Sequence, residues 1–376
     1  MASIYKTIRS EDIASTRTVL HEAIPLTGTI VSGTYGDFGS EGNVKNYAHG
    51  MFQSVYDYPY LSSSANHIFD ITLGFSTESA LSSSTTSQQS KKQNIYNQMA
   101  QVLMGYDKNG VVQRFDSDGD LFGTQTDKMN DVIFVNFARL LVKDELQKET
   151  FTLELGVTSS FTSPMDSRVT LKDTGAASDY RVNSPTGEYA VLYVSNSAGT
   201  PLNGASFDPN FSGTGKEQAA GLLFYQAGVA VITSSVFMSS TDNGLLSASH
   251  LVGKSPQWES DGISLTASIT GSNIETNANS LRNRIFNLSF NNSVELNSTI
   301  YFCHLGANEF NYSSNPTYLS GSQIVVKAQS TDDPVSYLTT IGLYSSDNQL
   351  MATAKVSEPI KKTPATSLTF RVRLDY

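Results

Sequence analysis

Acidic side chains alternate along a short segment in the first half of the chain. The carboxylates that could bind a cation there are Asp116, Asp118, Asp120 and Asp127. Carboxylates at positions 1, 3 and 5 of a twelve-residue loop are typical of calcium sites. This segment departs from that pattern, because Leu121 stands where the sharp turn requires glycine and Asp127 replaces the bidentate glutamate. The sequence therefore predicts an acidic hairpin turn, with calcium binding as the alternative.

Two glycine-containing segments are candidates for phosphate binding. Residues 212–217 read SGTGKE, but a phosphate loop needs a hydroxyl side chain after its lysine, and Glu217 would repel phosphate. Gly33, Gly36 and Gly39 lie in an acidic turn region without the preceding strand and following helix of a dinucleotide site. Both segments are predicted to be loops, and no cofactor is expected.

The residue types used for nucleophilic and metal chemistry are scattered along the chain. The histidines show no pair at metal-ligand spacing: His21, His49, His67, His250 and His304. Cys303, the single cysteine, is adjacent to His304 in a predicted strand, so the two side chains point to opposite faces. Cys303 is predicted to be a small buried hydrophobe. We find no nucleophile elbow, zinc helix or acylation motif, and we expect a protein that is not an enzyme.

Aromatic residues form a second group with possible function. The chain has 18 Tyr and 19 Phe but one Trp. Tyrosine is enriched in interfaces, because its ring supplies contact area and its hydroxyl supplies orientation. Tyr56, Tyr58 and Tyr60 alternate with other residues, so an extended backbone places three rings on one face. The segment is predicted to be either a core or edge strand or a contact site.

Further interface candidates lie near the C-terminus. They are the aromatic side chains around Pro316 and two basic side chains of a predicted strand: Phe310, Tyr312, Tyr318, Arg371 and Arg373. The arginines could pair with acidic neighbours at a subunit boundary. A solvated strand is the alternative, because a surface ion pair contributes about 1 kcal/mol or less.

Composition limits the class of protein. Hydrophobic residues make up 39% of the 376 positions, which permits a sizeable core. Charged residues make up 16%, below the roughly 25% of an ordinary soluble domain. Low charge suits surfaces that other subunits cover. The formal net charge of −10 argues against nucleic-acid binding, and a single cysteine excludes an internal disulfide framework and indicates folding in a reducing cytosol.

One uncharged segment, residues 221–238, has nearly the length of a membrane-spanning helix. Gln226 and Gly228 interrupt it, and β-branched residues dominate its second half. We therefore predict one or two buried strands and no membrane segment. The N-terminal residues show no signal-peptide pattern, which favours assembly in a cytoplasm.

Periodicity predicts two helices in the N-terminal part, over residues 10–23 and 90–105, and a short helical piece over 245–251. Most other regular segments are predicted to be strands: 111–115, 132–142, 151–155, 190–194, 222–232, 285–290, 294–302, 324–328, 337–343, 349–356 and 368–374. The sequence thus predicts a mainly β protein with antiparallel, sandwich-like modules and a few N-terminal helices. An α+β portion, residues 1–160, would precede a β-rich portion, residues 161–376, with the boundary within 159–187.

Three long strings resemble structural proteins of tailed-phage virions. They are LRNRIFNLSFNN at 281–292, STIYFCHLGANEFNYSSNPTY at 298–318 and SYLTTIGLYSSDNQLMATAKVSEPIKKTPATSLTFRVRLDY at 336–376. The segments at 21–35, 49–70 and 221–237 are similar to the same group, namely proteins of large contractile-tailed phages that infect marine cyanobacteria. Residues 159–215 are the least familiar stretch.

The resemblance implies a structural subunit of the virion, in the tail or baseplate, whose partners are other virion structural proteins. It supplies no catalytic residues. A homo-oligomer or multi-copy ring is expected, assembled in the host cytoplasm. The alternatives are a neck or collar protein, a host-surface glycan-binding adhesin in which the Tyr56 segment stacks on sugars, and an envelope hydrolase, whose paired carboxylates the fold could bring together.

Overall fold

The computed structural model describes residues 5–27, 42–82, 86–117, 119, 128–166, 168–195, 219–238, 257–312, 319–320, 323–324, 329, 331 and 334–376. The chain forms two compact units. Unit 1 comprises Met1–Val19 and Glu295–Tyr376, and unit 2 comprises Leu20–Val294. Unit 2 is therefore one uninterrupted stretch of chain, whereas unit 1 is built from two segments distant in sequence.

The predicted domain boundary differs from this division. Residues 159–187 lie inside unit 2, where β8 (Arg168–Lys172) and β9 (Arg181–Ser184) pair with neighbouring strands. Their Ser, Asp, Pro and Gly residues mark loops between strands of one sheet. Two strands pass from one unit to the other instead, β1 (Ile13–Thr27) and β13 (Ile285–Leu305), and they are neighbours in the sheet.

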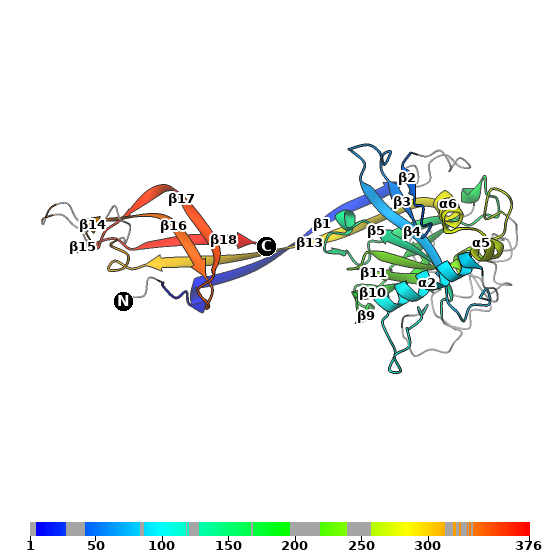
Figure 1. The fold of residues 1–376 in the computed structure, drawn as a ribbon, viewed down its shortest axis with the longest axis horizontal. Helices are drawn as coiled ribbons and strands as arrows, with labels where there is room; N and C mark the ends of the chain where they lie inside the picture. The colour runs from blue at the N-terminus through cyan, green and yellow to red at the C-terminus, as the bar shows by residue number, and fades with distance from the viewer. Residues whose placement is uncertain are drawn as a thin grey trace. The chain divides into compact units, whose positions relative to one another are not determined.

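Unit 2 is built on a large antiparallel sheet (Figure 1). From β13 its strand order is β7-β8-β10-β11-β12-β5-β4-β3-β2, with β6 beside β13 and β9 beside β10. The remaining bounds are β2 Val44–Asn46, β3 Gln53–Tyr56, β4 His67–Phe75, β5 Asp131–Phe137, β6 Glu145–Leu146, β7 Thr152–Gly156, β10 Gly187–Ser195, β11 Ala219–Phe224 and β12 Val229–Thr233.

The sheet of unit 2 folds back on itself around an apolar core. Phe137 of β5 meets Phe290 of β13 with 5.0 Å between ring centroids, although five strands separate β5 from β13 in the order. Every residue of β11 and β12 is buried, so both faces of the sheet are covered there. Burial of this extent supplies the main driving force for folding.

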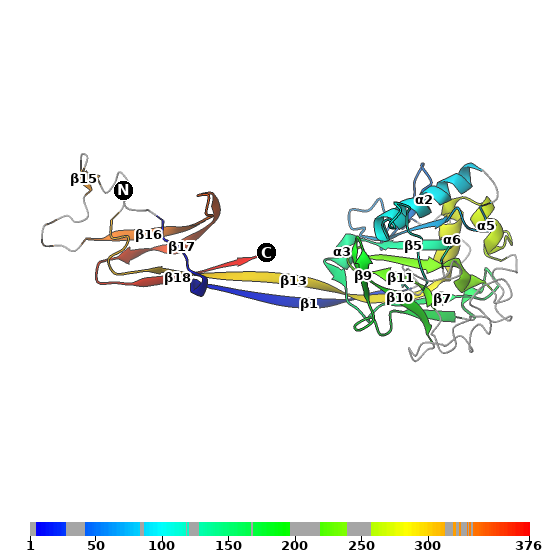
Figure 2. The same ribbon diagram turned by 90° about the horizontal axis from the view of Figure 1, so that it is seen from below.

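One helix covers part of the outer face of the sheet (Figure 2). This helix, α2 (Ser87–Leu103), begins at Thr86, whose side chain accepts a hydrogen bond from the Gln89 amide at 3.3 Å. It lies against Gly74 of β4, where a Cβ atom would come within 2.7 Å of the Lys92 carbonyl oxygen. Only glycine permits this approach. The other helices are α3 Arg139–Val142, α5 Leu265–Gly271 and α6 Ile274–Arg284, with 3₁₀ turns η1 Ser10–Asp12, η3 Pro164–Asp166 and η4 Ser234–Phe237.

Buried lysine Lys92 joins α2 to α5. Its ammonium donates to the backbone oxygens of Ser268 at 3.3 Å, Ile269 at 2.5 Å and Ser272 at 2.6 Å. These carbonyls belong to the end of α5, where the last helical carbonyls have no partner within the helix. Burial lowers the pKa of Lys92 to about 8, against a smaller opposing effect of Glu259.

In unit 1, β13 pairs with β18 (Leu368–Asp375) from Ser298↔Asp375 to Leu305↔Leu368. A long hairpin, β16 (Ser336–Tyr344) and β17 (Leu350–Lys362), forms a separate two-stranded sheet. Its turn lies at the predicted Asp347-Asn348 position, and Asn348 adopts a left-handed φ of 59°. The short strands β14 Leu319–Ser320 and β15 Gln323–Ile324 also pair.

The predicted mainly β fold with few helices is confirmed. The strands predicted at 222–232 form the hairpin β11–β12, and no helix among the described residues is long and apolar enough to cross a membrane. The predicted helix at 90–105 is observed as α2, which begins three residues earlier than predicted. The helices α5 and α6 lie in the C-terminal portion, where the one helical segment predicted was the short piece at 245–251.

The predicted helix at 10–23 is wrong. Ser10 and its acidic neighbours form only the 3₁₀ turn η1, and the strand β1 begins at Ile13. Thr16, Thr18 and Val19 are β-branched and suit an extended backbone, and pairing with β13 overrides the helix-start signal. The separate strands predicted at 285–290 and 294–302 form the single strand β13. The predicted helical piece at 245–251 lies outside the described residues.

We predict that Lys92→Met lowers the free energy of unfolding by about 2–4 kcal/mol, because it leaves two buried carbonyl oxygens and one part-buried carbonyl oxygen without their donor. Urea denaturation of the full chain measures this. Lys108→Met, at an exposed position of unit 2, is the control and should change stability by less than about 0.5 kcal/mol. Equal stabilities for the two variants would contradict the role assigned to Lys92.

Candidate docking surface

Buried apolar side chains are distributed very unequally between the units. The large hydrophobic cluster runs from Val55 to Phe290 and lies wholly in unit 2. In the described part of unit 1, Leu343 and Val372 are the only buried hydrophobic residues. These strands leave most of their apolar side chains exposed, and large exposed apolar patches are typical of interaction sites.

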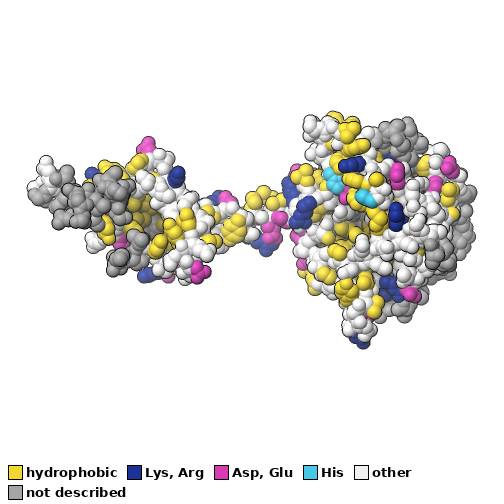
Figure 3. Space-filling view, viewed as in Figure 1, with side chains coloured by type: hydrophobic (Ala, Val, Ile, Leu, Met, Phe, Trp, Pro, Cys, Tyr) yellow, Lys and Arg dark blue, Asp and Glu magenta, His cyan; other side chains and the backbone are white. Residues whose placement is uncertain are grey.

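Unit 1 exposes many large apolar and aromatic side chains (Figure 3). Met351 is 70% exposed, Leu350 is 53% exposed, and both lie at the start of β17. The same exposed class includes Tyr5, Ile13, Val19, Leu296, Phe302, Phe310, Tyr312, Tyr337, Tyr344 and Tyr376. These residues come from β1, β13, β16 and β17 and from the segments beside them, so the exposed apolar side chains are spread over the described strands of unit 1.

The strand β18 has one apolar and one polar face. Its half-buried or buried residues are Leu368, Phe370, Val372 and Leu374, and the residues between them are exposed. Arg371 lies opposite Phe302 of β13 in the register. The exposed face therefore mixes basic, hydroxyl and aromatic groups, a combination suited to a subunit contact.

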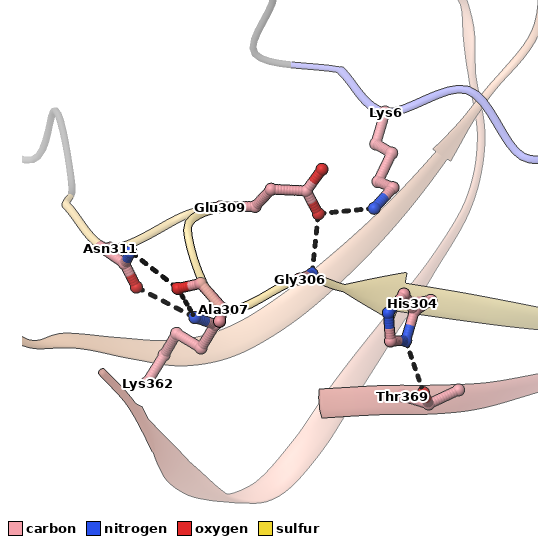
Figure 4. A network of polar contacts seen from close by, with 8 residues as sticks. All are labelled: Lys6, His304, Gly306, Ala307, Glu309, Asn311, Lys362 and Thr369. Carbon is pink, nitrogen blue, oxygen red and sulfur yellow. Dashed lines mark hydrogen bonds and ion pairs between the residues drawn. The ribbon is translucent and has the colours of Figure 1, made fainter. Parts of the chain in front are cut away.

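A polar network replaces the missing core at one end of unit 1 (Figure 4). The fully buried Lys362 ammonium donates to the Ala307 and Thr363 backbone oxygens and the Asn311 side-chain oxygen, each at 2.9 Å. The Asn311 amide donates to the Ala307 oxygen at the same distance. This lysine fixes the end of β17 to the turn after β13.

The same turn is tied to the N-terminal segment. Glu309 accepts a hydrogen bond from the Gly306 amide at 2.7 Å and forms an ion pair with Lys6 at 2.5 Å. The Lys6 ammonium, followed by the Gly306 amide, lowers the pKa of Glu309. The ion pair is therefore formed above the ordinary pKa of a glutamate and is lost as the pH falls through the lowered value. His304 Nδ1 lies 2.9 Å from the Thr369 hydroxyl and links β13 to β18.

Four of the five predicted C-terminal interface residues lie among the described residues. Phe310 is 37% exposed, in the turn after β13, with a left-handed φ of 54°. Tyr312 is 53% exposed and lies two residues further on, whereas Tyr318 lies outside the described residues. Arg371 is exposed on β18. Arg373 Nε lies 2.7 Å from Asp375 Oδ1, so within this chain its acidic partner belongs to the same strand.

The predicted tyrosine row is different in the structure. Tyr56 ends β3, and Tyr58 and Tyr60 lie in the turn beyond it. Pro59 lies in this turn, and proline cannot donate the ladder hydrogen bond of a strand. Tyr56 is half-buried, with its ring 6.2 Å from that of Tyr60, and Tyr58 is 60% exposed.

The predicted metal and nucleophile candidates are less informative. Asp116 is fully buried and forms an ion pair with Lys128, while Asp118, Asp120 and Asp127 lie outside the described residues. Within the part of the chain that the structure describes, no three acidic, histidine or cysteine side chains are grouped to hold a metal. Cys303 is half-buried opposite Phe370, and burial raises the pKa of its thiol.

Comparisons with protein-family models, curated proteins and solved structures found no match. The residues with the clearest structural role in unit 1, Lys362 and Glu309, were not among the predicted site residues. The sequence offers one signal for Lys362, a lysine pair bracketed by Pro359 and Pro364 that suggests a protected strand edge. Lys361 is exposed as that pattern suggests, and Lys362 faces inward.

We predict that Lys362→Met increases amide hydrogen exchange in residues 305–312 and 355–363 by about ten-fold or more, because three part-buried acceptors lose their donor. Hydrogen-exchange mass spectrometry of the full chain measures the effect. Lys361→Met is the matched control, since it removes the same charge from the exposed neighbouring position. Equal exchange in the two variants would contradict the network's role.

Proposed function

We propose that this protein is a non-enzymatic structural subunit of a phage virion, in its tail or baseplate. It acts by docking to neighbouring subunits. The observation that supports this proposal is the contrast between unit 1's long strands and its two buried hydrophobic residues among those described. The resemblance of residues 281–292, 298–318 and 336–376 to virion proteins supports the same function.

The free energy of folding explains why unit 1 needs neighbours. Ordering a residue's backbone costs about 1–2 kcal/mol, and burial of apolar surface returns about 25 cal/mol per Å². Unit 1 buries little apolar surface within itself, so its sheet gains stability when a neighbour covers the exposed side chains. Such a subunit is stable in an assembly, where many modest contacts act together.

The neighbours proposed first are copies of the same chain. The described part of unit 1 carries interspersed charges of both signs, such as Arg371, Lys355, Glu358 and Asp347, so two copies can meet without strong repulsion. Copies are also present wherever the chain is made, and closed symmetric oligomers are the commonest assemblies. Other virion proteins would then bind the completed ring or bundle. A neck or collar position would use the same surface.

We predict that the full chain is an oligomer in solution at micromolar concentration, with a mass at least twice the 40.7 kDa of one chain. The double variant Leu350→Lys/Met351→Lys should shift the mass toward the monomer. Burying the two ammonium groups in the interface would make the free energy of association less favourable by several kcal/mol, on the order of the penalty for burying an unpaired charge. Light scattering after size exclusion measures both. Leu140→Lys, at a 65% exposed position of unit 2, is the control and should assemble normally. A monomeric parent chain would contradict self-assembly.

We also predict that virions of a phage encoding this chain contain the polypeptide in several copies. Quantitative mass spectrometry of gradient-purified particles measures the copy number against the major capsid protein. Absence of the chain from intact particles would contradict the proposed location. Release of sugars or peptides from cell envelopes by the isolated protein would support a hydrolase instead.

A further inference from the structure

A compact group of aromatic and polar side chains occupies the outer face of unit 2 where β2, β3 and β4 lie side by side. We call it the aromatic face and define it by these residues: Lys45, Tyr47, Phe52, Ser54, Tyr56, Tyr60, His67 and Asp70. The register places Lys45 opposite Ser54 and Ser54 opposite Asp70, so one polar row crosses the three strands. All residues of the aromatic face belong to unit 2, whereas the exposed apolar residues of the docking surface belong to unit 1.

The outer face is only partly covered by α2. Asp70, Thr72 and Gly74 alternate along β4 and therefore share this face. The helix α2 packs onto Gly74, with the Lys92 carbonyl and the Tyr96 amide closest to it. At the other end of the strand, Asp70 stays half-buried opposite Ser54 of β3, and Tyr56 carries the aromatic ring of β3.

The rings of the aromatic face contact one another. Tyr56 lies 5.3 Å from His67 and 6.2 Å from Tyr60 between ring centroids, and Tyr47 lies 4.8 Å from Phe52. Tyr60 keeps 37% of its surface exposed. These contacts hold the rings in place, so a ligand that stacks on them does not have to order them first.

A hydrogen-bonded chain runs between the rings. Asp70 Oδ1 accepts from the Ser54 hydroxyl at 2.5 Å and lies 2.8 Å from His67 Nε2. The Ser54 hydroxyl also lies 3.2 Å from the Tyr47 hydroxyl. The Asp70 carboxylate raises the pKa of His67, which favours a protonated imidazole that donates to it. Donors and acceptors are thus fixed beside exposed aromatic surface.

A basic group borders the same rings. Lys45 Nζ lies 4.8 Å from the Tyr47 ring centroid and 5.9 Å from that of Tyr60. With His67 protonated, Lys45 and His67 oppose the single carboxylate of Asp70 and leave one net positive charge, which disfavours cationic ligands and is too small to select strongly anionic ones. Charged side chains are depleted at the cores of protein–protein interfaces, and here they lie at the centre. The chemistry therefore fits a neutral ligand with an apolar face and hydroxyl groups at its edge.

We propose that the aromatic face binds neutral pyranoside glycans. The C–H face of a sugar ring would stack on Tyr60 and Tyr56, and its hydroxyl groups would exchange hydrogen bonds with Asp70, His67 and Lys45. Each of these groups lies beside the rings in the structure. This function is independent of the proposed assembly, because it uses unit 2 alone.

Saturation-transfer NMR on the full chain tests the proposal, with methyl glycosides of glucose, galactose, mannose and N-acetylglucosamine as probes. A glycan array extends the test to oligosaccharides. Binding of at least one neutral probe is expected, with saturation concentrated on ring protons. Absence of signal from every probe and from the neutral glycans of the array would overturn the proposal, as would selective binding of sulfated or sialylated glycans.

Two variants locate the site. Tyr60→Ala should weaken binding of the responding probe by about ten-fold, because a stacking ring is lost. Tyr60→Phe should retain most of it, since the ring remains. The matched control is Tyr106→Ala, which removes a 53% exposed tyrosine elsewhere in unit 2 and should leave affinity within about two-fold. Equal affinities for Tyr60→Ala and Tyr106→Ala would place binding elsewhere and overturn the assignment.

Discussion

Burial of apolar surface differs sharply between the two units of this protein. In unit 2 the sheet folds back so that Phe137, Phe151 and Phe290 pack together, and the strands β11 and β12 are buried on both faces. Among the described residues of unit 1, Leu343 and Val372 alone are buried hydrophobes. The hydrophobic effect scales with the area removed from water, so the two units differ in what they need from their surroundings.

Buried basic side chains give both units order where apolar packing is insufficient. Lys92 holds the end of α5 in unit 2, and Lys362 holds the turn after β13 in unit 1. Arg284 acts similarly, donating to the backbone oxygens of Gly156 at 3.1 Å and Thr158 at 2.8 Å, and burial lowers its pKa to about 9. Each side chain satisfies carbonyls that would otherwise be buried without a donor. The resulting geometry is specific, because hydrogen bonds fix directions that apolar contacts leave free.

Local sequence patterns predicted elements well where neighbours in the chain determine them. The α2 periodicity, the β11–β12 hairpin and the alternation of β18 all depend on residues close in sequence. Prediction failed for β1, where pairing with β13 decides the conformation. It failed to find Lys362, because its acceptors Ala307 and Asn311 lie 55 and 51 residues away. The units themselves were hidden for the same reason, since unit 1 joins segments from before and after unit 2.

This chain order also sets the timing of events during translation. Unit 2 is encoded by one uninterrupted stretch and can fold while the ribosome is still synthesising the C-terminal segment of unit 1. The strand β1 is made early, but β13 and β18 emerge only after residue 285, so the sheet of unit 1 forms last. A nascent chain therefore cannot form the sheet of unit 1, with its exposed apolar side chains, until the strands that build the core of unit 2 have been synthesised.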